Sequence, residues 1–280
     1  MYFLNINKPK GISSFDVIRS LRKKLAIKQI GHSGTLDPLA SGVMQVAVGK
    51  ATKLLDYLDS DKEYIADLVF GYVTDTFDSE SEPKFIAQPS FTLEEFTAVL
   101  KSFIGKTNQI PPKYSAIKSN GKKLCDLARK EVDIDIDSFA REIEIYSIEI
   151  LEFSQNKAKI KVFCKKGTYI RSLVNDIGLK LSCGAYMSDL TRTKAGNFYI
   201  ENSDLLDGDL TKINPIQALS LPKYELNDVE FSVIINGNFI NCNSSFDNEN
   251  ILLTKDYKLV SLAKISDNLI KPKKIFKEIE

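Results

Sequence analysis

Alternating apolar and polar residues mark several strands along the chain. The stretches 141–153 and 157–167 both alternate and are separated by a polar turn, which predicts an antiparallel pair of strands. The stretch 62–74 also alternates and is rich in β-branched and aromatic residues, so it predicts another strand. Residues 42–49, GVMQVAVG, are predominantly apolar, which predicts a buried strand.

Helical periodicity appears between these strands. Ser13 and Asp16 have the spacing of a capping box, and the apolar residues that follow, up to Leu25, recur on one helical face. The segment 92–105 is amphipathic and ends at a glycine, as helices commonly do. Two further segments predict helices, 51–58 and 169–181. This mixture of strands and helices indicates an α+β fold with a substantial sheet.

The last sixty residues have a different character. From about Leu221 the chain consists of short alternating pieces, 231–237 and 250–265, separated by Asn, Gly, Ser and Asp. A proline-containing linker near 214–223 precedes them. We therefore expect two domains, a large α+β domain over 1–220 and a small β-rich domain over 221–280.

The composition is that of an ordinary globular protein, with 43% hydrophobic and 27% charged residues among 280. No apolar run approaches the ~18–20 residues of a membrane helix, and the first residues contain no secretory signal. The four cysteines are scattered and there is one histidine, which argues against a zinc site and for reduced thiols in a cytoplasmic protein. No dinucleotide-binding or P-loop motif is present. We expect no metal, no cofactor and no membrane association.

The net charge of +1 conceals two basic segments. The first contains Lys8, Lys10, Arg19, Arg22, Lys23, Lys24 and Lys28. The second contains Lys101, Lys106, Lys113, Lys118, Lys122, Lys123, Arg129 and Lys130. If both segments fold onto one face, they would form an electrostatic footprint for phosphates. The alternative is a set of solvated helix faces.

The loop GHSGTLDPLASGV, residues 31–43, contains the only histidine, His32, five positions before Asp37. Pro38 restricts Asp37 toward an extended conformation, and the surrounding glycines allow tight turns. Such a loop could present a carboxylate into a cleft. The alternative is an ordinary turn or cap aspartate, the usual role of an Asp-Pro pair.

Six ordered blocks of the sequence resemble the bacterial TruB family, the tRNA pseudouridine(55) synthases. They are NKPKGISSFDVI (7–18), GHSGTLDPLASGVMQVAVGKATKL (31–54), KEYIADLVFGYVTDTFDSES (62–81), QIPPKYSAIKSNGKKL (109–124), CKKGTYIRSLVNDIG (164–178) and LTRTKAGNF (190–198). The resemblance implies a mixed, mainly antiparallel sheet flanked by helices, with a small C-terminal β domain that contacts RNA. It also implies isomerisation of uridine 55 in the T arm of tRNA by a cofactor-independent monomer.

The resemblance also implies roles for individual residues. Asp37 matches the catalytic aspartate and Arg171 the active-site arginine, whose guanidinium could pair with that carboxylate. Tyr64 matches a tyrosine that packs against the target base and could act in the later deprotonation at C5.

Three further residues match positions that contact the substrate. Tyr169 and Leu190 match the lining of the uridine pocket. His32 matches a residue that stacks in the RNA where the flipped uridine had been.

The sequence also departs from the family pattern at three positions. Cys125 replaces an aromatic residue, Glu131 a glycine, and Thr191 an arginine that often precedes Arg192. These changes affect the expected grip on the T arm rather than the reaction. Two other functions were weighed: a non-catalytic RNA-binding or RNA-folding module, which would not need the carboxylate, and a nucleoside hydrolase.

Overall fold

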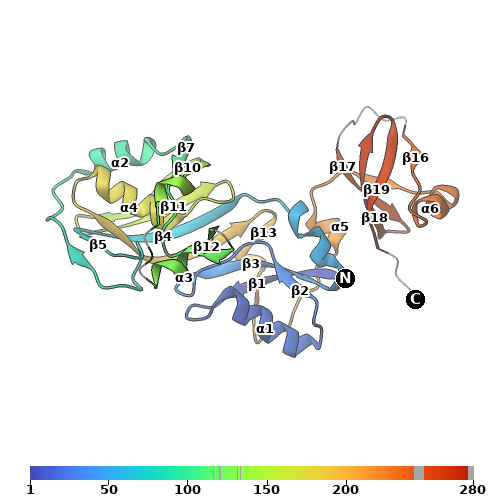
Figure 1. Ribbon diagram of the computed structural model, residues 1–280, viewed down its shortest axis with the longest axis horizontal. Coiled ribbons are helices and arrows are strands. Elements are labelled where there is room, and N and C mark those ends of the chain that lie inside the picture. Colours follow the sequence, from blue (N-terminus) through green and yellow to red (C-terminus); the bar gives the residue numbers. More distant parts are fainter. Residues whose placement is uncertain (116, 120, 131, 133, 243–248, 277–280) are drawn as a thin grey trace.

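A ten-stranded sheet forms most of the protein (Figure 1). The computed structural model describes residues 1–115, 117–119, 121–130, 132, 134–242 and 249–276. The strand order is β14-β1-β3-β12-β4-β11-β10-β7, with β2 paired to β3 and β13 to β12. The strands are β1 (Tyr2–Lys8), β2 (Ile30–His32), β3 (Ser41–Val48), β4 (Lys62–Phe70), β7 (Gly105–Gln109), β10 (Arg141–Ser154), β11 (Lys157–Cys164), β12 (Ala185–Ala195), β13 (Phe198–Tyr199) and β14 (Asp204–Leu205).

Most neighbouring strands in this sheet are antiparallel, and only β1 with β14 and β3 with β12 run parallel. The predicted α+β class with a mixed, mainly antiparallel sheet is therefore confirmed. The predicted pair 141–153 and 157–167 is also confirmed, because β10 and β11 form an antiparallel ladder.

Three helices cover parts of the large sheet: α1 (Ser14–Leu25), α2 (Leu93–Lys101) and α4 (Ile170–Lys180). The predicted capping box at the start of α1 is present, since Ser13 and Asp16 exchange hydrogen bonds. Helix α1 packs its apolar face beside β1 to β3, whereas α2 and α4 lie together at the other end of the sheet (Figure 1).

Strands β1 and β3 are buried on both faces. Leu4 and Met44 belong to the core beneath α1, whereas Phe3 and Val43 point the opposite way into a second core. Side chains of a strand alternate between faces, so burial of both faces requires a continuous apolar run. This explains the largely apolar sequence at 43–48, in which the one polar residue, Gln45, is buried and donates a hydrogen bond to the carbonyl oxygen of Ala195.

Two predicted elements differ in detail. The strand expected over 62–74 ends at Phe70, because Gly71 takes a φ of +92° and turns the chain before β5 (Tyr72–Val73). The helix expected over 51–58 is a 3₁₀-helix, η1 (Gly49–Tyr57). The remaining short elements are β6 (Lys84–Phe85), β8 (Lys118–Ser119), β9 (Lys122–Lys123), α3 (Leu124–Ala128), η2 (Ile136–Phe139), η3 (Ile200–Asn202) and α5 (Pro215–Ala218).

A second sheet of five strands, in the order β15-β17-β18-β19-β16, forms the C-terminal part. Its strands are β15 (Lys223–Glu225), β16 (Ile240–Asn241), β17 (Asn250–Lys255), β18 (Lys258–Ser266) and β19 (Leu269–Ile275). The strand-like interpretation of 231–237 is wrong, because α6 (Asp228–Ile234) occupies most of it. A capping box between Asn227 and Glu230 starts this helix, and its short length made the apolar spacing ambiguous.

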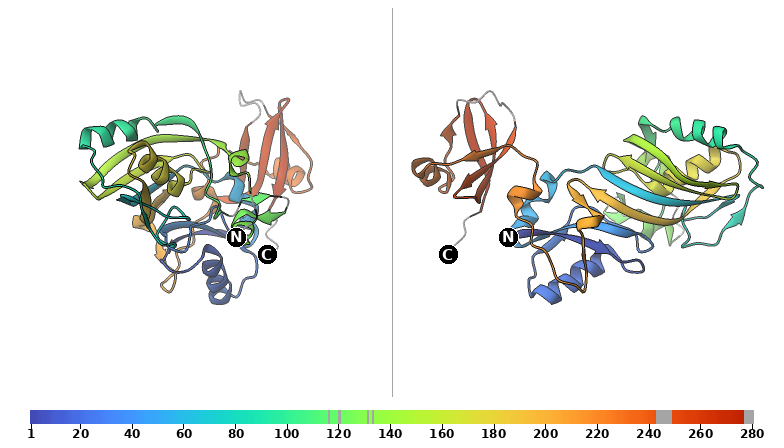
Figure 2. Two further views of the ribbon diagram at one scale, coloured as in Figure 1. Left: turned by 60° about the vertical axis from the view of Figure 1, so that its left-hand side comes forward. Right: turned by 180° about the vertical axis from the view of Figure 1, so that it is seen from behind.

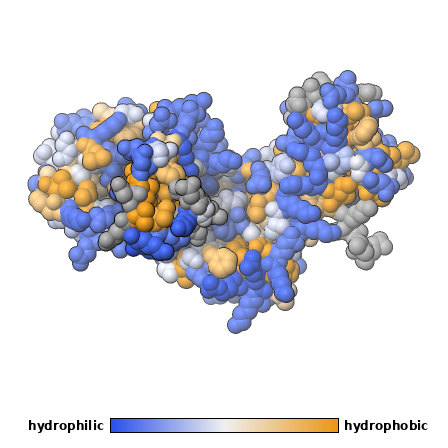
Figure 3. All heavy atoms as spheres, viewed as in Figure 1, coloured by the Kyte–Doolittle hydropathy of each residue, from blue (hydrophilic) through white to orange (hydrophobic). Residues whose placement is uncertain are grey.

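The two sheets meet at η1. Leu252 and Leu262 of the small sheet share a buried cluster with Leu54 of η1 and Phe3 of β1. The views in Figure 2 show the small sheet beside the η1 end of the large one. Polar side chains cover much of the face shown in Figure 3. Over the described ranges, no helix has the length and apolar character needed to cross a membrane.

The contact between α4 and β12 generates a stability prediction. A Cβ atom on Gly178 of α4 would lie 2.1 Å from the backbone nitrogen of Ala185. We expect Gly178→Ala to lower the free energy of unfolding by about 1–3 kcal/mol or more, because overpacking forces the backbone to move. Urea denaturation measures this. Gly208→Ala is the control, because its Cβ would meet only an ordinary contact at 3.5 Å from Leu205. Equal stability of the two variants would contradict the predicted clash.

Candidate active site

Five of the six expected site residues line one cleft of about 750 Å³. They are Asp37, Tyr64, Tyr169, Arg171 and Leu190. The cleft lies where the loop after β2, the start of β4 and the N-terminal end of α4 meet. His32 does not line this cleft. It lines a neighbouring hollow together with residues of η1.

Asp37 and Arg171 form an ion pair, with Nη2 of Arg171 2.9 Å from Oδ2 of Asp37. The arginine side chain is 6% exposed and the aspartate side chain 35% exposed, so the carboxylate faces the cleft while its partner lies behind it. The guanidinium also donates hydrogen bonds to the backbone oxygens of Thr76 and Tyr114. This network fixes the orientation of the carboxylate.

Asp78 completes the network, and the sequence analysis did not identify it as a site residue. Its Oδ2 lies 3.3 Å from Nη1 of Arg171, and its side chain is 1% exposed. The hydroxyl of Thr76 and the backbone N–H of Glu80 donate to its Oδ1. The position of Asp78 within the family-like block 62–81 is the sequence signal that points to a role in the site.

Glu80 stands at the rim of the same cleft. Burial raises the pKa of its carboxyl, and the nearby carboxylates of Asp78 and Asp37 act in the same direction. The cleft therefore carries acidic groups at its mouth as well as beside Arg171.

The N-terminal segment holds the Asp37 loop from both sides. The hydroxyl of Ser14 accepts the N–H of Leu36 at 2.8 Å and donates to its carbonyl oxygen at 2.9 Å. On the other side of Asp37, the carbonyl oxygen of Pro38 accepts the N–H of Gly11 and the ammonium group of Lys8. These bonds set the position of the residue between them.

Lys8 was expected in a basic segment that would face phosphates, and this expectation is wrong for Lys8. The residue is 0% exposed, and its ammonium group donates to the backbone oxygens of Pro9, Ile12 and Pro38. Burial lowers the pKa of Lys8 to about 8, and the carboxylate of Asp37 opposes this shift. Lys8 therefore connects the turn at 9–12 to the loop that contains Asp37.

Tyr64 and Leu190 reach the cleft from the paired strands β4 and β12. Burial raises the pKa of the Tyr64 phenol to about 12, although the Arg192 guanidinium opposes this shift. The phenol is therefore protonated in the resting site at neutral pH. Arg192 lies opposite Tyr64 in the strand register and is 2% exposed.

Arg192 is a second residue that the sequence analysis did not assign to the site, although it lies in the quoted block 190–198. Its Nε donates to the carbonyl oxygen of Val43, and Nη2 donates to that of Gly34. Gly42 lies opposite Arg192 in the pairing of β3 with β12. A Cβ atom on Gly42 would lie 2.2 Å from the backbone oxygen of Arg192, so only a glycine fits at this position.

Tyr169 precedes the first residue of α4 and is held through its backbone. The side-chain amide of Gln109 accepts the N–H of Tyr169 at 2.8 Å and donates to its carbonyl oxygen at 3.0 Å. The guanidinium of Arg141 lies 4.6 Å from the centre of the Tyr169 ring. The ring therefore forms a fixed wall of the cleft.

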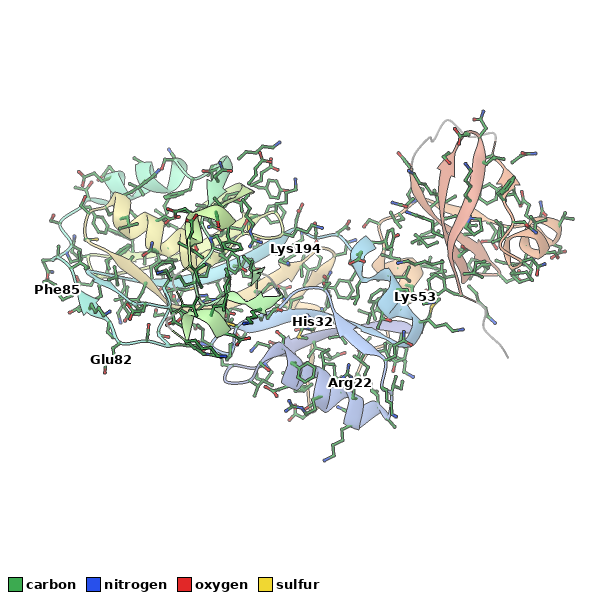
Figure 4. The ribbon with its side chains drawn as sticks, in the orientation of Figure 1. Arg22, His32, Lys53, Glu82, Phe85 and Lys194 are labelled. Carbon is green, nitrogen blue, oxygen red and sulfur yellow. The ribbon has the colours of Figure 1, made fainter. Side chains whose placement is uncertain are left out.

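His32 ends β2, and its Nδ1 accepts the backbone N–H of Gly34. Burial lowers the pKa of His32, and the nearby Arg192 guanidinium acts in the same direction. Its imidazole is therefore neutral at neutral pH. In Figure 4, His32 lies above α1, where Arg22 is labelled, and to the left of η1, where Lys53 is labelled.

Two of the three residues that depart from the family pattern, Cys125 and Thr191, lie in or near the site. Cys125 lines the cleft beside Arg129. The hydroxyl of Thr191 forms a hydrogen bond with that of Ser41 on the neighbouring strand β3. Glu131 lies outside the described residues.

Within the described ranges, no group of three or more His, Cys, Asp or Glu residues is arranged to hold a metal ion.

Two family profiles match the chain and define its class of protein. The N-terminal domain profile of TruB family pseudouridylate synthases matches residues 22–170, and the profile of the tRNA pseudouridylate synthase B C-terminal domain matches 171–213. Fold and cleft are therefore those of a pseudouridylate synthase. The chain belongs to the TruB family.

Individual relatives agree with this assignment. The chain is 45% identical to tRNA pseudouridine synthase B of Fusobacterium nucleatum, over 94% of this chain and 95% of the relative. It is 49% identical to the Clostridium novyi protein of the same name, over 71% of this chain and 69% of the relative. A crystal structure of a Cbf5–Nop10–Gar1 complex superposes with a TM-score of 0.74 and 25% identity, covering 99% of this chain and 85% of that chain.

The partly buried position of the single histidine generates a prediction. We expect the His32 imidazole to titrate with a midpoint below the ordinary value of ~6.5, because burial disfavours its charged form. The proton NMR signal of the only imidazole measures this directly. The same protein unfolded in urea is the control and should titrate near ~6.5. A folded-state midpoint above the unfolded one would show that the ring is stabilised as a cation.

Proposed function

We propose that this protein converts a uridine of tRNA to pseudouridine without a cofactor, and that its target is uridine 55 in the T arm. The observation that carries the proposal is the half-exposed Asp37 carboxylate held by the buried Arg171 at the bottom of the cleft. Membership of the TruB family and the names of the relatives support tRNA as the substrate.

The reaction conserves all atoms of the substrate. The bond between ribose C1′ and uracil N1 breaks, the base turns within the cleft, and a new bond forms between C1′ and C5. The proton on C5 is then lost and N1 gains one. Asp37 supplies the carboxylate that either attacks C1′ or removes a proton from C2′. The network of Arg171 and Asp78 holds it in position during both halves of the reaction.

Tyr64, Tyr169 and Leu190 form the walls against which the uracil packs. Because the phenol of Tyr64 is protonated in the resting site, it first acts as a hydrogen-bond donor and a flat surface. Removal of the C5 proton by Tyr64 would require that another group take the phenolic proton. The raised pKa would make the resulting phenolate a strong base.

His32 has a separate task in this proposal. A uridine inside a folded T arm is stacked, and flipping it out costs a few kcal/mol. The flat imidazole of His32, in its own hollow beside the cleft, would fill the vacated place in the stack. A neutral ring suits this role, since it requires no proton transfer.

A non-catalytic RNA-binding or RNA-folding module is the main alternative to this function. Such a module would gain nothing from a buried arginine paired with two carboxylates beside an open cleft. We also assign residues 1–220 to the catalytic domain and 221–280 to a small RNA-contacting domain, in a cytoplasmic monomer.

Asp37 is tested by Asp37→Asn, which keeps the shape but removes the charge. We expect turnover to fall at least about 1000-fold, because the group that acts at the sugar is lost. Purified protein is incubated with unmodified tRNA, and pseudouridine is mapped by carbodiimide-based primer extension. The matched control is Asp75→Asn, which alters an exposed, ion-paired aspartate. Turnover of Asp37→Asn near that of the wild type would refute the assignment, and product at another tRNA position would refute the T-arm target.

Arg171 is tested by Arg171→Lys. Lysine keeps a positive charge but lacks the planar fork that reaches Asp37, Asp78 and two carbonyl oxygens together. We expect single-turnover rates to fall about 100-fold or more, with only a small change in tRNA affinity. Unchanged rates would remove Arg171 from the catalytic network, whereas equal losses in rate and affinity would indicate a general structural defect.

A further inference from the structure

Lys62 lies between the two hollows of the site. It lines the cleft that contains Asp37 and also the neighbouring hollow that contains His32. It is the first residue of β4, two positions before Tyr64, so both side chains lie on the same face of the strand. In the proposed reaction, the target nucleotide leaves the stack near His32 and enters the cleft of Asp37. Its backbone must pass the position of Lys62.

Two cationic groups converge beside Gly34 at this point. A Cβ atom on Gly34 would lie 3.1 Å from Nζ of Lys62 and 3.7 Å from Nη1 of Arg192. A side chain at position 34 would crowd both groups, because its Cβ atom alone would lie closer to Nζ of Lys62 than an ordinary van der Waals contact.

Neither cation forms an ion pair with a carboxylate in the part of the chain that the structure describes. Arg192 is 2% exposed, and its Nη1 is a buried donor without a hydrogen-bond partner, although Nε and Nη2 both donate to carbonyl oxygens. A buried donor with no acceptor is costly unless a ligand provides one.

We propose that Lys62 and Nη1 of Arg192 form a binding site for one phosphate of the RNA backbone, next to the flipped nucleotide. The inference rests on the proposed function and extends it from the base to the backbone. A phosphate has several acceptor oxygens and can accept from both cations at once. The carboxylate of Asp37 does not serve as the acceptor for these two cations, because it already pairs with Arg171.

The electrostatics of Lys62 agree with an anion site. Burial lowers the pKa of Lys62 to about 8, and the positive charges of Arg192 and Lys166 act in the same direction, while Cys164 and Asp61 oppose them. A bound phosphate would relieve this repulsion. At neutral pH the ammonium group is still mostly protonated and able to donate.

The first test requires no catalysis. Inorganic phosphate is added to the protein while the NMR signal of His32 is followed, with sodium chloride at equal ionic strength as the salt control. We expect a saturable shift in the wild type and in Lys180→Gln, an exposed lysine at the far end of α4. Lys62→Gln should bind phosphate about 10-fold or more weakly, as expected when a charged hydrogen bond is lost, and Lys62→Arg should retain binding. No shift beyond the salt control, or equal shifts in Lys62→Gln and the wild type, would overturn the proposal.

The second test locates the phosphate in the RNA. Stem-loops carry one uncharged methylphosphonate linkage at each position flanking the target uridine, and their affinities and single-turnover rates are measured. At one position, the neutral linkage should lower the affinity of the wild-type protein for the RNA about 10- to 100-fold. The same linkage should cause no further loss of affinity in Lys62→Gln, which has already lost the contact. Additive losses at every position would show that Lys62 does not contact a phosphate. If the all-phosphate RNA binds but yields no pseudouridine, the proposed function fails, while the affinity data still decide on the phosphate site.

Discussion

A guanidinium group that is almost completely removed from water organises the site. Arg171 is 5% exposed, and a charge this buried requires compensation from its surroundings. The compensation comes from Asp37, Asp78 and the backbone oxygens of Thr76 and Tyr114. These groups belong to three separate segments of the chain. Arg171 therefore joins the loop after β2, the loop after β5 and the segment near 114 into one structure.

A second buried cation fixes the same loop from the opposite side. The ammonium group of Lys8 binds three carbonyl oxygens, including that of Pro38, while Ser14 holds Leu36. The loop position of Asp37 is therefore set by its neighbours on either side, and its side chain by Arg171. Catalytic groups need to be held within a fraction of an ångström of their working geometry, and this double support provides that constraint.

The sequence predicted the elements that depend on local patterns. The capping box at Ser13, the strand pair of β10 and β11 and the two-sided burial of β3 all follow from spacing and side-chain type. The segment 231–237 was misjudged because a seven-residue helix shows too few turns to separate its period from that of a strand.

The site itself depended on contacts between distant residues. Asp37 could be proposed from its loop, but Arg171, Tyr64, Tyr169 and Leu190 were identified only through the family resemblance. Asp78 and Arg192 were not predicted because nothing in the local sequence distinguishes a buried charged residue from a surface charge. Lys8 was misjudged for the same reason, since only the fold shows that its ammonium group is enclosed.

The distribution of charge around the cleft separates the parts of a nucleotide. The side of Arg171 carries two paired carboxylates with Glu80 at the rim, whereas the side of Gly34 carries the converging cations of Lys62 and Arg192. The Tyr64 phenol in the cleft and the His32 imidazole in the neighbouring hollow are both uncharged at neutral pH. In the proposed reaction, the anionic RNA backbone would be attracted to the side of Lys62 and Arg192. The uncharged base and sugar would then face Asp37, where the proposed chemistry at C1′ takes place.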